Sequence, residues 1–275
     1  MIEALKINWK VYLIEAWALG MFMLSACAFV ILFEHPYFGL PVIIPSPIMR
    51  RVCIGLAMGI TAVILIYSKW GKQSGAHMNP AVTLANYQLD RITLQDAIWY
   101  ILAQFTGAAF FVFILKWVAF SFIANPSVNY VVTAPGIYGV WVAFIAEMLL
   151  SFTLFIIVLF ISNSRWAKFT GYFAGALVFL FIVFEAPLSG MSINPARSFG
   201  SALPAQNWDS FWLYIIAPIT GMQLAALFYR NMYMVFKKEC RSLNVFMSGD
   251  GKHNAVYKVL CWYKKDEDGK IIKYK

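Results

Sequence analysis

The residues of this chain whose type and spacing point to chemistry are two copies of one tripeptide. They are Asn79-Pro80-Ala81 and Asn194-Pro195-Ala196. Asparagine is a strong N-cap and proline is favoured at the first helical position, so each copy predicts the start of a helix. The asparagine oxygen caps its own helix, which leaves the amide NH₂ group free to donate hydrogen bonds to an oxygen of another molecule.

The flanking residues of the two tripeptides also match. Ser74–Val82 reads S-G-A-H-M-N-P-A-V, and Ser189–Arg197 reads S-G-M-S-I-N-P-A-R. Further along, Ile101–Gly107 aligns with Ile215–Gly221. One such tripeptide occurs by chance in about 3% of chains of this length, but two copies in matching surroundings indicate an internal repeat.

The composition places these motifs in a membrane protein. Of the 275 residues, 61% are hydrophobic and 13% are charged, and the mean hydropathy is +0.68. A soluble domain has about a quarter charged residues. This composition excludes a disordered chain, a disulfide-rich secreted module and a soluble enzyme. We therefore expect a polytopic membrane protein without enzymatic activity.

Six apolar segments are long enough, or nearly so, to cross a bilayer. They are Val11–Phe33, Ile48–Tyr67, Ala97–Ile123, Ile137–Ile161, Phe169–Phe184 and Phe211–Phe236. Two shorter apolar segments, Pro80–Leu89 and Pro195–Ala205, start at the tripeptides and would cover only about half of the hydrocarbon thickness as helices. The sequence therefore predicts an all-α membrane fold with six transmembrane helices and two half-helices.

The segments divide into a first repeat, residues 11–125, and a second repeat, residues 126–236. Each repeat holds three spans, an odd number, so the two repeats must be inverted in the membrane. Inverted repeats with short, proline-interrupted segments indicate a site at the membrane midplane. The two half-helix N-termini would meet there, each with roughly half a positive charge, and would repel cations. They would also interrupt the chain of hydrogen-bonded water molecules along which protons move.

The net charge of +9 has an uneven distribution that predicts orientation rather than nucleic-acid binding. Lysines precede the first span and follow the last one, whereas the connection Ser121–Tyr138 has no charge. The positive-inside rule then places both termini, residues 1–10 and 237–275, in the cytoplasm of a multi-pass protein of the cell membrane. Arg50 and Arg51 lie on the outer side and are the exception.

The basic tail, residues 237–275, predicts a small hairpin. Val256–Tyr263 is rich in β-formers, and Asp268-Gly269 is a turn signal before Ile271–Tyr274. The spacing of the tail residues Cys240, His253 and Cys261 fits no standard metal site, so we expect no metal.

Together these motifs resemble the aquaporin, or major intrinsic protein, family over about Val11–Phe236. The resemblance implies six tilted spans and two re-entrant half-helices around one pore per subunit, in a homotetramer. It implies passive flow of water and small uncharged solutes without a cofactor. Asn79 and Asn194 would then form the central constriction of the pore.

The resemblance also implies an outer selectivity filter. Arg197 is its charged member, Met191 and Ile182 lie three and twelve residues before Asn194, and Met58 completes it, with Gly59 as the alternative. Strict water channels usually carry an aromatic residue and a histidine at two of these positions, and this chain has neither. The sequence therefore leaves glycerol, urea and peroxide open as solutes beside water.

Two acids inside apolar spans, Glu15 and Glu147, need an explanation because a charge in hydrocarbon is costly. One interpretation is that each accepts hydrogen bonds from a half-helix loop. The other is a proton relay in a proton-coupled secondary transporter of a small neutral solute. The pore would be lined by loop carbonyl groups, since irregular backbone at this depth must be buried or face water. These carbonyls belong to Gly75, Ala76, His77, Gly190, Met191 and Ser192.

Overall fold

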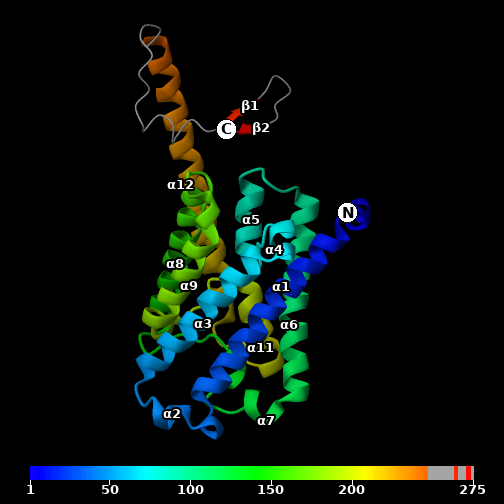
Figure 1. Ribbon diagram of the computed structural model, residues 1–275, viewed down its shortest axis with the longest axis vertical. Coiled ribbons are helices and arrows are strands. Elements are labelled where there is room, and N and C mark those ends of the chain that lie inside the picture. The colour runs from blue at the N-terminus through cyan, green and yellow to red at the C-terminus, as the bar shows by residue number, and fades with distance from the viewer. Residues whose placement is uncertain (247–262, 266–270, 274–275) are drawn as a thin grey trace.

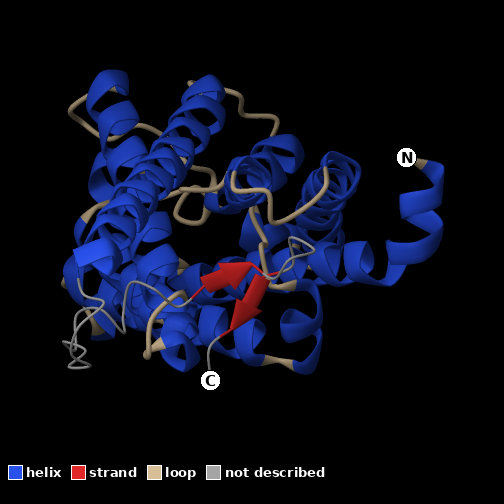
Figure 2. Ribbon diagram, turned by 90° about the horizontal axis from the view of Figure 1, so that it is seen from above, coloured by secondary structure: helices blue, strands red, loops and turns tan. Residues whose placement is uncertain are grey.

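The structure is a computed structural model that describes residues 1–246, 263–265 and 271–273; for residues 233–246, 263–265 and 271–273 it describes the backbone alone. Helices make up nearly all of the described chain, as the view along the bundle shows (Figure 2). Within this described part, six helices are long and apolar enough to cross a membrane. The long helices are α1 (Ile2–Glu34), α3 (Pro47–Tyr67), α6 (Leu94–Val118), α8 (Val140–Ser162), α9 (Thr170–Phe184) and α12 (Phe211–Phe246).

Short elements connect these spans. Four are short α-helices: α2 (Leu40–Ile43), α4 (Lys69–Ser74), α7 (Phe120–Ile123) and α10 (Ala186–Ser189). Three are 3₁₀ turns: η1 (Pro36–Phe38), η2 (Asn129–Val131) and η3 (Ala167–Phe169). Two half-helices, α5 (Pro80–Gln88) and α11 (Pro195–Ala205), complete the helical fold. The predicted fold of six spans and two half-helices is therefore confirmed.

The span boundaries differ from the predicted ones in three places. Helix α1 begins at Ile2, well before the apolar run that starts at Val11, and its first turns are polar. The predicted third span, Ala97–Ile123, is two helices, because Ala119 has non-helical backbone angles between α6 and α7. Helix α12 continues to Phe246 and extends beyond the other helices (Figure 1).

The two half-helices interlock the repeats. Helices α5 and α11 lie in opposite halves of the bundle along its long axis (Figure 1). Helix α11 packs against α6, the third span of the first repeat, and α5 packs against α12, the third span of the second. Each half-helix is therefore supported by the other repeat, so neither repeat is complete alone.

Close contacts at two glycines explain one of the repeated motifs. Gly107 of α6 lies so close to α1 that a Cβ atom there would be 2.2 Å from the carbonyl oxygen of Ala16. Gly221 of α12 meets α8 in the same way, with 2.2 Å between a Cβ and the carbonyl oxygen of Met148. Small residues allow membrane helices to approach closely. The glycine that ends each I-x-A-x-x-T-G match is therefore a helix-packing residue.

The outer surface of the bundle is apolar. On α3, for example, Leu56, Ile60 and Ile64 recur every fourth residue and are all more than half exposed. In water such a continuous apolar face would be unfavourable, whereas lipid chains or a second subunit would cover it at no such cost. The exposed faces therefore agree with a bundle surrounded by membrane.

In the tail, β1 (Tyr263–Lys265) and β2 (Ile271–Lys273) pair antiparallel, with Lys264 opposite Ile272. The first strand overlaps the predicted strand 256–263 only at Tyr263. The turn signal at Asp268-Gly269 lies outside the described residues, as do the side chains of Cys240, His253 and Cys261.

The glycine contacts make a testable prediction. Gly107→Ala should force α1 and α6 apart and destabilise the protein by about 2 kcal/mol, the usual cost of overpacking. Thermal unfolding of the detergent-solubilised protein measures the change. Thr106→Ala, at the exposed neighbouring position, is the matched control and should unfold like the original chain. Equal unfolding temperatures for the two variants would contradict the packing role of Gly107.

Candidate functional site

The two asparagines of the repeated tripeptides lie at the convergence of the half-helices. The Oδ1 atom of Asn79 accepts from the backbone N–H of Ala81 at 2.8 Å. The Oδ1 atom of Asn194 accepts from Ala196 and Arg197 at 3.1 and 3.3 Å. Each side chain is therefore the N-cap of its own helix, as the Asn-Pro pattern predicts.

The amide groups of these asparagines are not as free as the sequence suggested. Asn79 Nδ2 donates to the carbonyl oxygen of Ile193, and Asn194 Nδ2 donates to that of Met78, both at 2.7 Å. This corrects the expectation that both NH₂ groups are uncommitted. An amide has two N–H donors. One of them ties the two loops together, and the other has no acceptor among the described residues.

Glu15 of α1 holds the loop before α5. Its carboxylate accepts from the Ser74 hydroxyl at 2.6 Å and from the backbone N–H groups of His77 and Met78 at 3.0 and 2.7 Å. Gln104 of α6 donates a fourth bond at 2.8 Å. Glu15 is fully buried. These bonds satisfy loop N–H groups that no water reaches, which lowers the cost of burying the acid.

Glu147 of α8 makes the corresponding contacts in the second repeat. It accepts from the Ser189 hydroxyl and from the backbone N–H groups of Ser192 and Ile193, each at 2.6 Å. It is also fully buried. The two acids are therefore equivalent in position and in partners, apart from the Gln104 bond, which has no counterpart in the second repeat.

The loops held by these acids have an unusual backbone. Positive φ angles occur at Ala76 and Met78 in the first loop, and at Met191 and Ile193 in the second. Such angles are uncommon outside glycine, and a β-branched residue such as isoleucine rarely adopts them. The same strained path in both loops requires the surrounding hydrogen bonds to hold it.

This path leaves six loop carbonyl groups without a hydrogen-bond donor among the described residues. They are the predicted ones, of Gly75, Ala76, His77, Gly190, Met191 and Ser192. The carbonyls just before each set are paired instead: the Tyr100 hydroxyl donates to Ser74 at 2.8 Å and the Tyr214 hydroxyl donates to Ser189 at 2.6 Å. The two tyrosines directly precede the aligned segments that begin at Ile101 and Ile215, so they occupy matching positions, but their bonds to the loop carbonyls were not predicted.

A cavity of about 500 Å³ runs beside both loops. Its walls come from α1, α3, α8 and α9, from the two half-helix loops, and from residues of α5, α10, α11 and η2. The described side chains of α6 and α12 do not line it. All six residues with unpaired carbonyls line it, together with Asn79 and Asn194. A buried backbone oxygen needs a partner, and in a cavity that partner is water or a solute oxygen.

The four predicted filter residues line the same cavity. They are Met58 of α3, Ile182 of α9, Met191 and Arg197. Gly59, the alternative to Met58, does not line it and packs against the carbonyl oxygen of Gly175 instead. The structure thus brings one cation and three flexible or branched apolar side chains to a common space.

Charge along the cavity is of one sign. Its lining residues include Arg51, Arg91 and Arg197, and among the residues that the structure describes no aspartate or glutamate lines it. Arg197 is buried, and its Nη1 atom donates to the carbonyl oxygen of Val131 at 2.8 Å. Glu15 and Glu147 lie behind the loops, outside the lining. No sequence motif points to Arg51 or Arg91 as lining residues.

Glu185, which follows α9, is a buried acid that the sequence analysis also missed. Both of its carboxylate oxygens lack a hydrogen-bond partner among the described residues, because the nearby Ser189 hydroxyl donates to Glu147. Burial raises the pKa of Glu185 to about 8, and the negative charge of Glu147 acts in the same direction. The equivalent position in the first repeat is Trp70, so this acid has no symmetry mate.

The loop-holding acids make the second prediction. Glu15→Gln or Glu147→Gln would turn an amide NH₂ group toward the loop N–H donors and displace a half-helix. We expect solute flux in proteoliposomes to fall several-fold and the unfolding temperature to drop. Glu3→Gln, at an exposed position of the same helix α1, is the control. Normal flux in both core variants would show that the loops do not depend on these carboxylates.

The third prediction concerns pH. Since the carboxyl of Glu185 has a pKa of about 8 in the folded protein and 4.5 as its ordinary value, the unfolded chain loses this proton first. Stability should therefore fall as pH rises from about 4.5 to 8. The unfolding temperature of Glu185→Gln should equal that of the original chain at pH 4 and should exceed it by a margin that grows up to pH 8. Thermal unfolding across this range tests the trend, and a constant difference would contradict it.

Comparisons with known proteins agree with this geometry. The profile of the family described as major intrinsic protein matches residues 2–229. Aquaporin AqpM of Methanothermobacter thermautotrophicus is 36% identical over 190 residues, which are 66% of this chain and 76% of that protein. Aquaporin-5 of Rattus norvegicus is 32% identical over 267 residues, 92% of each chain.

The fold also matches a solved structure. The X-ray structure of the aquaglyceroporin from Plasmodium falciparum superposes with a TM-score of 0.65, covering 81% of this chain and 95% of that one at 19% identity. That likeness supports the fold, and the profile match over most of the chain shows the family. The chain therefore belongs to the major intrinsic protein family, the aquaporin channels for water or small neutral solutes.

Proposed function

We propose that water and solutes of the size of glycerol, urea or peroxide pass through the cavity beside the half-helix loops. One observation carries this proposal: the asparagine pair that ties the two loops together lies on the wall of the same cavity as the six unpaired carbonyls. The remaining amide donors and the carbonyl oxygens would replace the hydrogen bonds that a solute loses with bulk water.

Exclusion of ions and protons follows from the same constriction. The two half-helix N-termini each contribute roughly half a positive charge, and an oxygen held by both asparagines has its hydrogens turned toward the exits. Such an orientation interrupts proton transfer. The absence of acidic lining residues opposes cations further.

The filter proposed here consists of Met58, Ile182, Met191 and Arg197. Arg197 supplies the polar contact, because a guanidinium has five N–H donors and only its Nη1 bonds to a protein atom in the described part of the chain. The other three side chains offer no donor that would hold water firmly. This composition favours the passage of water and also of neutral solutes larger than water.

A proton-coupled transporter is the competing mechanism, and the contacts of Glu15 and Glu147 weigh against it. Both carboxylates accept three or more hydrogen bonds, two of them from loop backbone N–H groups, and neither lines the cavity. A proton relay needs a group that exchanges protons with the pathway. Their geometry suits a structural role.

The assembly that we propose is a homotetramer in the cell membrane with both termini in the cytoplasm. The apolar outer faces of the helices support burial against lipid and neighbouring subunits. Lysines 6 and 10, near the N-terminus of α1, support the orientation under the positive-inside rule.

Side-by-side permeability in the same proteoliposomes tests the function. Stopped-flow light scattering would record osmotic water flow and then glycerol entry, each with and without a proton gradient. Flux that does not saturate and ignores the gradient supports the channel. Flux that requires the gradient, or that saturates at low glycerol concentration, would establish the transporter instead.

The fourth prediction addresses Arg197. Arg197→Val removes the guanidinium from the filter and should raise glycerol or urea flux several-fold. The asparagine pair and helix ends remain, so the proton leak, followed with a pH-sensitive dye inside the vesicles, should stay small. Asn79→Ala serves as the contrasting variant, because it breaks the tie to Ile193 and should damage the central constriction. If Arg197→Val changed neither solute selectivity nor proton leak, Arg197 would not belong to the filter.

A further inference from the structure

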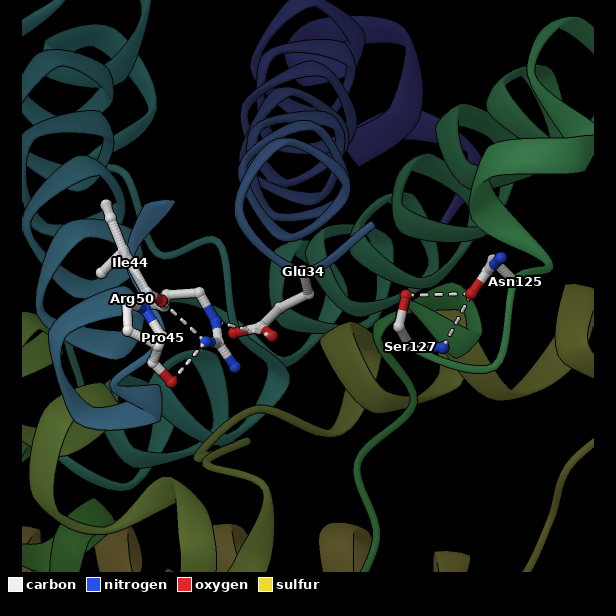
Figure 3. Close-up of polar contacts among 6 residues, drawn as sticks. All are labelled: Glu34, Ile44, Pro45, Arg50, Asn125 and Ser127. Carbon is white, nitrogen blue, oxygen red and sulfur yellow. Dashed lines mark hydrogen bonds and ion pairs between the residues drawn. The ribbon is translucent and has the colours of Figure 1, made fainter. Parts of the chain in front are cut away.

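Two adjacent arginines near the start of α3 have opposite surroundings. Arg50 forms an ion pair with Glu34, with 3.0 Å between its Nε and the carboxylate. Its Nη1 atom also donates to the carbonyl oxygens of Ile44 and Pro45 at 2.9 and 3.1 Å (Figure 3). The charge of Arg50 is therefore compensated, and its side chain fastens the connection between α1 and α3.

Arg51 has no such compensation. Its Nε atom donates to the carbonyl oxygen of Val183 at 3.3 Å, whereas its two Nη groups have no acceptor among the described residues. No carboxylate of the described residues lies within ion-pair distance of it. Unlike Arg50, it lines the cavity. A permanent positive charge with unused donors thus borders the lumen.

Its position relates Arg51 to the proposed filter. It precedes Met58 by seven residues, two turns of α3, so both lie on the same helix face about 10 Å apart along the axis. The bond to Val183 holds its guanidinium beside the residue that follows Ile182 on α9. Arg51 therefore borders the mouth of the filter on the side of the membrane where α3 begins.

Arg197 contributes a second guanidinium to the same cavity. It is 8% exposed, and its Nε and Nη2 atoms have no acceptor in the described part of the chain. Guanidinium groups bind carboxylate, sulfate and phosphate oxygens through paired N–H donors. A cleft with charges of one sign and low-dielectric walls concentrates counter-ions.

We propose that Arg51, together with Arg197, forms an oxyanion-binding site at this mouth of the pore. The ligand class is a small soluble oxyanion, such as sulfate, phosphate or a carboxylate. The bound anion would stand in the path of neutral solutes ahead of the filter and reduce their flux. This inference rests on the proposed filter and extends it by a regulatory ligand.

The experiment measures osmotic water permeability of proteoliposomes that contain the full chain. Sodium sulfate is present on both faces. Sodium chloride of equal ionic strength is the reference, and an impermeant neutral sugar added to the sulfate buffer equalises the osmolality. At a sulfate concentration equal to its dissociation constant, we expect about a two-fold fall in permeability, because half of the sites are then occupied.

Three variants separate Arg51 from its neighbours. Arg51→Met should abolish the sulfate effect, and Arg51→Lys, which keeps the charge but not the paired donors, should need more sulfate. Arg50→Met removes a charge from the same segment and should keep the effect. Arg91→Met, which alters another arginine that lines the cavity, should keep it as well.

The outcomes distinguish this inference from the proposed channel function. Absence of water and glycerol flux in sulfate-free vesicles would overturn the channel function itself. Normal flux that sulfate leaves unchanged, or a sulfate effect that persists in Arg51→Met or disappears in Arg91→Met, would overturn the oxyanion site alone. If Arg51→Met does not assemble, thermal unfolding of the original chain and Arg51→Lys decides: sulfate should stabilise the original chain at lower concentration, and equal responses would overturn the site.

Discussion

A helix that stops in the middle of a membrane leaves backbone N–H and C=O groups where no lipid can satisfy them, and this constraint governs the whole structure. The chain meets it twice. Glu15 and Glu147 take the loop N–H groups, and Asn79 and Asn194 cap the half-helices and bind the opposite loop. The carbonyls that remain unpaired border the cavity. Water or a solute in this cavity would supply the hydrogen-bond donors that these carbonyl groups still need.

The two repeats share this solution, but function depends on where they differ. Arg197 of the second repeat corresponds to Val82 of the first, so only the second half-helix carries a guanidinium at this position. Glu185 likewise corresponds to the exposed Trp70. These two differences place an arginine and an acid beside the second half-helix that the first one lacks. The symmetric residues hold the scaffold, and the asymmetric ones distinguish the two mouths of the pore.

The fold could be predicted from the sequence because the signals for it are local. The length of an apolar run indicates a membrane span, and an Asn-Pro pair indicates the start of a helix. It also singled out Glu15 and Glu147, since an acid in an apolar run demands a partner. It did not predict that each asparagine binds a carbonyl of the other loop, because that bond depends on the three-dimensional approach of residues over one hundred positions apart. The different surroundings of Arg50 and Arg51 were equally hidden, since the two residues are adjacent and of the same type and only the fold separates them.

The reciprocal bonds between the asparagines and the opposite loops also bear on how the chain is made. Asn79 finds its acceptor in Ile193, which the ribosome adds more than one hundred residues later. Helix α11 in turn needs α6 to pack against, and α5 needs α12. The first half-helix is held by Glu15 within its own repeat, but it lacks its contacts with α12 and with the second loop until the second repeat enters the membrane. The lining of the pore comes from both repeats, so a chain that stops after the first repeat lacks the second loop and the lining residues of α8 and α9.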